Sequence, residues 1–96
     1  MKIATLASVL ALAVSIAPAF AADRTVTLRV ENIDCDLCAP IIRRSLLRVN
    51  GVIRATVSIE QNTATVIFDD ARTNVAALTA ATTNAGFPSR LVERTE

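Results

Sequence analysis

The 96-residue sequence contains no histidine, tryptophan or tyrosine, and its single lysine is Lys2. Without histidine the chain lacks the most frequent acid–base catalyst and one of the two side chains that usually build closed zinc sites. Only three phenylalanines are present and the arginines are scattered, so we expect no nucleic-acid partner. Carboxylates and two cysteines are the reactive side chains that remain.

Residues 1–21 have the layout of an export signal. Lys2 precedes an apolar run from Ile3 to Ile16, and the segment ends in Ala19-Phe20-Ala21, an A-x-A site for signal peptidase. A membrane anchor is disfavoured because spanning a bilayer takes about 20 apolar residues. We therefore predict a signal peptide over residues 1–21 and one mature domain over residues 22–96.

Alternation of apolar and polar residues predicts strands over 25–30, 52–60 and 63–69. A tight turn at 61–62 joins the second strand to the third, and a short last strand is expected around 90–92. The inward-facing residues are predicted to be Val26, Leu28, Val30, Ile53, Ala55, Val57, Ile59, Ala64, Val66 and Phe68.

Between these strands, apolar residues recur at helical spacing in two segments. The first helix must begin close to Cys38, because Pro40 is tolerated only in a first turn, and Gly51 is expected to cap its end. The second is expected to start from a cap at 73–74 and to close at 85–86. The apolar positions are Leu37, Ile41, Ile42, Leu46 and Val49 in the first helix and Val75, Leu78 and Ala81 in the second.

The resulting order, βαββαβ, predicts an α+β, ferredoxin-like fold: a four-stranded antiparallel sheet with two helices on one face. A domain this small hides only about 60% of the surface that its unfolded chain exposes. It therefore has one modest core and little room for an enclosed active site.

Both cysteines of the chain, Cys35 and Cys38, are spaced C-x-x-C between the first strand and the first helix. A thiol at a helix start has a lowered pKa, because unpaired backbone N–H groups and the helix dipole favour the thiolate. The thiolate is the form that binds soft metals, and this spacing lets both sulfurs close on one ion.

Three interpretations of the pair stay open on these grounds. A structural disulfide suits an exported chain, but so short a loop constrains the unfolded state little. A thioredoxin-like redox pair, as in a small thiol oxidoreductase, is opposed by acidic Asp36 beside the sulfurs. The third interpretation, which we favour, is capture of a soft metal ion by two thiolates, with Asp34 as an auxiliary ligand for divalent ions.

The segment NIDCDLC, residues 32–38, resembles the GMTCxxC or GMDCxxC loop of heavy-metal-associated domains. The likeness extends to RTVTLRV, VNGVIRATVSIE and ATVIFDDARTNVAALTAATTNAGFPS. With its export signal, the chain is similar to the periplasmic mercury-binding members of bacterial mercury-resistance systems. The resemblance implies a ferredoxin-like, monomeric periplasmic carrier that is not an enzyme, holds Hg(II) through Cys35 and Cys38, and passes it to an inner-membrane mercuric or heavy-metal transporter.

Four residues depart from the pattern of that family. Asn32 and Ile33 stand where the family has Gly and Met, and we expect Ile33 to anchor the loop in the core. Phe87 replaces a Tyr, and its ring is expected either to cover the metal site or to pack in the core. Asp34 replaces Thr, as in zinc, cadmium and lead transporter domains, and is expected to be a ligand or a helix cap. We rank Hg(II) first as the bound ion, another divalent soft metal second and Cu(I) third.

Overall fold

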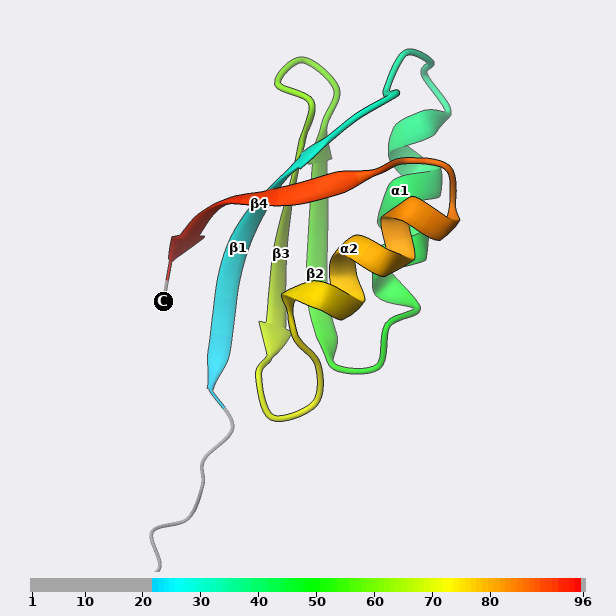
Figure 1. Ribbon diagram of the computed structural model, residues 1–96. Helices are drawn as coiled ribbons and strands as arrows, with labels where there is room; N and C mark the ends of the chain where they lie inside the picture. Colours follow the sequence, from blue (N-terminus) through cyan, green and yellow to red (C-terminus); the bar gives the residue numbers. More distant parts are fainter. Residues whose placement is uncertain (1–21, 96) are drawn as a thin grey trace, which may run out of the picture.

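Six elements follow one another in the order strand, helix, strand, strand, helix, strand (Figure 1). The computed structural model describes residues 22–95, so the predicted signal peptide, residues 1–21, lies outside the described residues. The elements are β1 (Asp23–Val30), α1 (Cys38–Leu47), β2 (Val52–Ser58), β3 (Thr63–Asp69), α2 (Val75–Asn84) and β4 (Ser89–Thr95). This is the predicted βαββαβ order.

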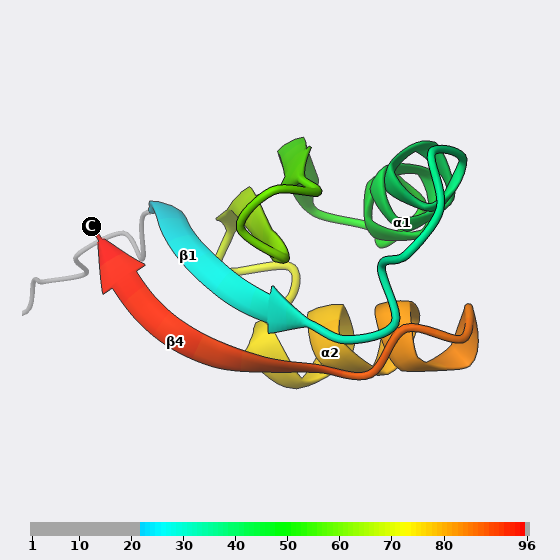
Figure 2. The same ribbon diagram turned by 90° about the horizontal axis from the view of Figure 1, so that it is seen from above.

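The strands form one sheet in the order β2-β3-β1-β4, and every neighbouring pair is antiparallel. Helix α1 packs on the side of β2, and α2 packs on the side of β1 and β4 (Figure 2). The two helices also contact each other. The predicted ferredoxin-like fold is confirmed.

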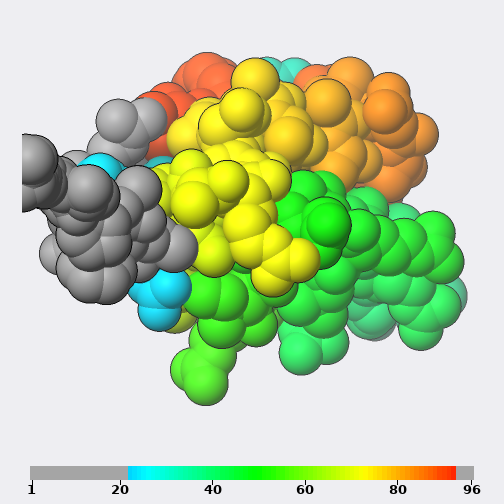
Figure 3. Space-filling view, turned by 90° about the horizontal axis from the view of Figure 1, so that it is seen from below, coloured from blue at the N-terminus to red at the C-terminus, as the bar shows by residue number. Residues whose placement is uncertain are grey.

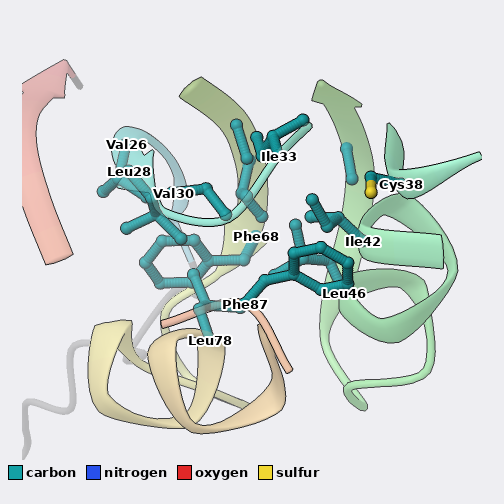
Figure 4. Packing of buried hydrophobic residues seen from close by; sticks show 13 residues of the cluster. Val26, Leu28, Val30, Ile33, Cys38, Ile42, Leu46, Phe68, Leu78 and Phe87 are labelled. Carbon is teal, nitrogen blue, oxygen red and sulfur yellow. The ribbon is translucent and has the colours of Figure 1, made fainter. Parts of the chain in front are cut away.

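The core lies between the sheet and the helices (Figure 4). The alternation predicted for β1 and β3 is confirmed, since the three predicted inward residues of each strand are buried. The core residues are Val26, Leu28, Val30, Ile33, Cys38, Ile42, Leu46, Ala55, Ala64, Val66, Phe68, Leu78 and Phe87.

The predicted inward face of β2 is wrong at both ends of the strand. A register shift between Val52 and Arg54 lets Val52 pack against the core and leaves Ile53 54% exposed. Such an irregularity breaks the strict alternation of faces along a strand. Ile59 lies beyond the end of β2, in the turn to β3, and is exposed. Of the predicted residues, Ala55 is buried and Val57 packs against the core.

Helix α1 begins at Cys38, as Pro40 requires, but its apolar stripe is narrower than the spacing suggests. The helix buries Cys38, Ile42 and Leu46, whereas Leu37 and Ile41 face solvent.

The predicted glycine cap of α1 is also wrong, because the helix ends at Leu47, before Gly51. Gly51 has φ 109° and instead turns the chain into β2. A Cβ atom there would lie 2.9 Å from Arg72 Cβ, so this turn requires glycine.

Helix α2 starts at the predicted cap, where Asn74 Oδ1 accepts the Ala77 N–H at 2.9 Å. Its buried positions are Leu78 and Thr82, with Ala81 only partly buried. The buried Thr82 hydroxyl is satisfied by Ser89 Oγ at 2.6 Å, which ties α2 to the start of β4. The buried face of α2 thus consists of apolar Leu78 and, one turn later, polar Thr82.

Asp70 ties the start of β1 to the end of β3. Its carboxylate accepts Arg24 Nε at 2.7 Å and the Ala22 N–H at 3.1 Å, and its backbone N–H donates to Ala22 O. Figure 3 shows this end of the domain, where the segment around residue 70 (yellow) lies beside the start of β1 (cyan). The hydrogen bond from Arg24, followed by that from Ala22, holds the pKa of Asp70 below its usual value.

Asp70→Asn should lower the free energy of unfolding at about pH 7, because the amide loses the charge that Arg24 recognises. A group with a lowered folded-state pKa stabilises the fold fully above its unfolded pKa of about 3.9. That stabilisation disappears as the pH falls through the folded-state pKa. Urea midpoints of both proteins should therefore differ near neutral pH and converge toward about pH 2. Glu60→Gln, an exposed change of equal charge, is the control, and an equal effect from it would contradict the role of Asp70.

Candidate metal centre

One cysteine lies in the loop that joins β1 to α1, and the other lies at the start of the helix; Figure 1 shows this loop. Cys38 is the first residue of α1, and its N–H donates to Cys35 O at 3.2 Å. Leu37 occupies the N-cap position and makes no side-chain cap hydrogen bond. The two sulfurs are thus held within one turn of chain at the positive end of the helix dipole.

Cys35 and Cys38 are joined as a disulfide, with their Cα atoms 5.3 Å apart. Cys38 is only 4% exposed and lies at the Ile42 end of the core, whereas Cys35 is exposed (Figure 4). The structure therefore shows the oxidised form of the pair, with one sulfur-bearing residue in the core and the other in solvent. An ion needs both sulfurs as thiolates, so the pair must be reduced before it binds metal.

Asp34, the predicted auxiliary ligand, is exposed. Among residues 22–95, no group of three or more Cys, Asp, Glu or His side chains is placed to hold a metal ion. The alternative role for Asp34 as a helix cap is wrong, because α1 has no side-chain cap. The structure thus brings Cys35 and Cys38 together without a third ligand, and a ligand role for Asp34 in the reduced protein stays a prediction.

Ile33 and Phe87 both belong to the buried core. Ile33 therefore anchors the loop between β1 and α1, residues 31–37, in the core, as expected of the residue at the family's Met position. This segment is called the metal loop below. Phe87 is 8% exposed and lies near Phe68, Leu46 and Leu78 in Figure 4. Burial of this kind favours the packing role for Phe87, and a covering role over the sulfurs stays a prediction.

Asn32 is a residue of the metal loop whose role the sequence patterns did not reveal. Its φ is 71°, and its side-chain amide donates from Nδ2 to Gly86 O at 3.3 Å. Asn adopts such left-handed backbone more readily than most residues other than Gly. Because Asn32 stands where the family has Gly, its left-handed backbone could have been predicted from the sequence. Its hydrogen bond to Gly86 could not.

Two exposed acids, Asp34 and Asp36, flank Cys35, and an apolar and basic surface begins on the other side of the pair. Leu37 is 72% exposed beside the cysteines, and Ile41 follows it on the outer face of α1. They border a shallow hollow of about 410 Å³ that lies against α1 and the end of α2. Its lining residues are Leu37, Pro40, Ile41, Arg44, Ser45, Arg48 and Ala85.

Residues 27–88 match the model of the heavy-metal-associated domain. The chain belongs to the heavy-metal-associated domain family. The domain is a metal-binding carrier and not an enzyme, which confirms the predicted family and class.

Bacterial relatives match most of the chain, two of them as follows. The mercuric transport protein periplasmic component of Acinetobacter calcoaceticus is 49% identical over 82 residues, covering 85% of this chain and 90% of that protein. The protein of the same name from Salmonella typhi is 48% identical over 82 residues, with the same coverage.

Solved structures agree with the fold. Oxidised MerP from Ralstonia metallidurans CH34 has a TM-score of 0.73 and 40% sequence identity, and the match covers 75% of this chain and all (100%) of that one. A copper-binding domain from HMA7, a P-type ATPase, has a TM-score of 0.75 at 27% identity, with coverage of 76% and 99%. The family fold therefore occurs in proteins named for different metals.

Phe87→Ala should lower the free energy of unfolding by about 3–5 kcal/mol, as is usual for a buried phenylalanine. Phe68→Ala, a change of equal size in the same core, is the matched control, and urea unfolding measures both. A loss far below that of Phe68→Ala would contradict the packing role. The milder changes Phe87→Leu and Phe68→Leu then allow Hg(II) transfer to a competing thiol to be compared in folded protein. Faster transfer from Phe87→Leu alone would show that the ring also covers the site.

Proposed function

We propose that residues 22–96 form a periplasmic carrier that takes up one Hg(II) ion through reduced Cys35 and Cys38 and passes it to an inner-membrane mercuric transporter. The observation that carries this proposal is the pair of sulfurs at the start of α1, in a chain similar along most of its length to mercuric transport components. The proposal takes Hg(II) from the names of those relatives and from the chemistry of the site.

The donor set suits an ion that is satisfied by two soft ligands. A closed zinc site usually has four ligands, and residues 22–95 gather no third Cys, Asp, Glu or His beside the two cysteines. Soft thiolates select soft ions, and both Hg(II) and Cu(I) are satisfied by two of them. The names of the relatives favour Hg(II). The first alternative is another divalent ion, namely Zn(II), Cd(II) or Pb(II), and the second alternative is Cu(I).

Binding of the ion requires the two sulfurs to move apart, and the burial of the two cysteines indicates which one moves. Metal–sulfur bonds of about 2.3 Å, as for zinc, separate two sulfurs by up to about 4.6 Å, so the sulfurs must move apart from their disulfide positions. Cys38 is held in the core by α1, whereas Cys35 lies in an exposed segment. Cys35 therefore makes most of the movement.

Unloading proceeds by ligand exchange. An incoming thiolate attacks the bound ion, a three-coordinate intermediate forms, and one resident sulfur leaves as a thiolate that is free to take a proton from water. Because Cys35 is exposed and Cys38 is buried, the third ligand approaches from the side of Cys35. The exposed apolar residues Leu37 and Ile41 offer a contact surface for the transporter next to that approach.

Location in the periplasm is supported by the export signal and by the names of the relatives, which are periplasmic components. Within the part of the chain that the structure describes, no helix is long and apolar enough to cross a membrane.

A small thiol oxidoreductase is the second candidate function, because the pair is seen as a disulfide at a helix N-terminus. Reduction of insulin by the dithiol form distinguishes this candidate from the carrier. Turnover of insulin without tight Hg(II) binding would replace the proposed function with the oxidoreductase.

The reduced mature protein should bind one Hg(II) per monomer and release protons near neutral pH, because the thiols must ionise. Loss of residues that merely support a metal ligand costs about 10–100-fold in affinity, so Cys35→Ala or Cys38→Ala should cost more than about 100-fold. Titration in the presence of a competing thiol measures this affinity. The oxidised protein is the control and should bind no ion. Tight binding retained by the double variant would overturn the metal site.

Asp34→Thr should leave Hg(II) binding nearly unchanged, because a two-thiolate mercury site gains little from a hard oxygen. Zn(II) and Cd(II) accept carboxylate and want more ligands, so their binding should weaken. Asp36→Thr removes the same charge on the other side of Cys35 and is the matched control. Parallel titrations at one pH compare the ions. Equal losses for every ion, or equal losses from both variants, would exclude Asp34 as a ligand.

A further inference from the structure

The metal loop is joined to the loop that connects α2 with β4. The segment after β1 runs beside the segment before β4 (Figure 2). Glu31 N–H donates to Pro88 O at 2.8 Å, and Asn32 Nδ2 donates to Gly86 O at 3.3 Å. The second bond is the one that a side chain makes, so it depends on the identity of residue 32.

Asn32 combines two properties that few residues share. Its φ of 71° lies in the left-handed region, where most side chains are strained and where Gly, Asn and Asp are favoured. Of these three, only Asn also carries an amide N–H that can donate to a carbonyl. Gly at this position would keep the backbone and lose the bond to Gly86.

The bond acts on the part of the loop that carries the exposed sulfur. Ile33 is the last buried residue before the pair, and the segment 34–37 is exposed until Cys38 enters the core. The position of Cys35 is therefore set by two anchors, Cys38 on one side and the segment 31–33 on the other. Loosening the second anchor widens the range that Cys35 explores relative to Cys38.

We propose that Asn32 is a positioning residue of the metal site. Its bond to Gly86 holds the metal loop against the loop that carries Phe87, keeps Cys35 close to Cys38 and slows the loss of the bound ion to competing thiols. The part of this inference that concerns the ion rests on the proposed carrier function. The part that concerns the loop does not.

The test compares Asn32→Gly with Asn62→Gly. Asn62 is the other non-glycine residue of the described chain with positive φ, 56°, and lies in the turn between β2 and β3. Its side chain makes no hydrogen bond to residues 22–95. Both substitutions place glycine in left-handed backbone, but only Asn32→Gly removes a bond between loops. The control therefore accounts for the added freedom of glycine in the unfolded chain.

Two readouts need no metal. Hydrogen exchange at the Glu31 amide, which bonds to Pro88 next to the bridge, should accelerate about two- to tenfold in Asn32→Gly relative to Asn62→Gly, the range expected for one lost hydrogen bond. Reduction of the Cys35–Cys38 disulfide by a small thiol should accelerate in the same direction. Urea midpoints should fall in both variants, and further in Asn32→Gly because it also loses the hydrogen bond.

The third readout is the rate at which Hg(II) passes from the protein to a small dithiol, which should rise about two- to tenfold in Asn32→Gly alone. Equal rates in the two variants for all three readouts would overturn the positioning role. So would an acceleration in Asn62→Gly that matches the fall in its own urea midpoint. If the wild-type protein holds no Hg(II), the carrier function fails, and the two metal-free readouts still decide whether Asn32 positions the loop.

Discussion

The burial of Cys38 is the constraint on which the site depends. Cys38 belongs both to the core and to the first turn of α1, so the packing of that helix against the sheet fixes one sulfur of the pair. Three residues earlier the chain is in solvent, so Cys35, which carries the other sulfur, is exposed. In the proposed carrier, a buried ligand beside an exposed one would give a chelate that forms on a fixed anchor and opens without unfolding the domain. The core of this small domain therefore serves the chemistry of the site as well as its stability.

The fold supplies this arrangement without selecting the ion. A copper-binding domain and oxidised MerP superpose on this chain about equally well, with TM-scores of 0.75 and 0.73. A shared fold seldom determines function, which depends on the residues placed on it. Three of the four residues that depart from the family pattern, Asn32, Ile33 and Asp34, lie in the loop just before the first cysteine. We therefore expect selectivity to depend on a few residues held by a common frame.

Local periodicity predicted the parts of the fold that obey it. The alternation in β1 and β3 and the restriction on Pro40 in α1 are local rules, and the structure follows them. The prediction failed at Ile53, where a register irregularity depends on pairing with β3 rather than on the sequence of β2 itself. The spacing of α1 could not show that Ile41 faces solvent, because burial depends on where the neighbouring elements end.

The local features of the site were predictable from the sequence, and its contacts between distant segments were not. Both cysteines, their place at a helix start and the buried Ile33 follow from short-range pattern and resemblance. Contacts between distant segments do not, and the bond from Asn32 to Gly86 spans 54 positions of the chain. The redox state of the pair is likewise set by the surroundings of the protein, through the thiols and oxidants that it meets.

The disulfide has a consequence for how much ion such a protein can hold. In the proposed carrier, oxidation and metal loading use the same two sulfur atoms, so the two states exclude each other within one molecule. A loaded molecule is shielded from oxidation for as long as the ion stays, and an oxidised one is empty until a reductant reaches Cys35. The carrying capacity of a population of these molecules is then governed by the supply of electrons as much as by the number of chains.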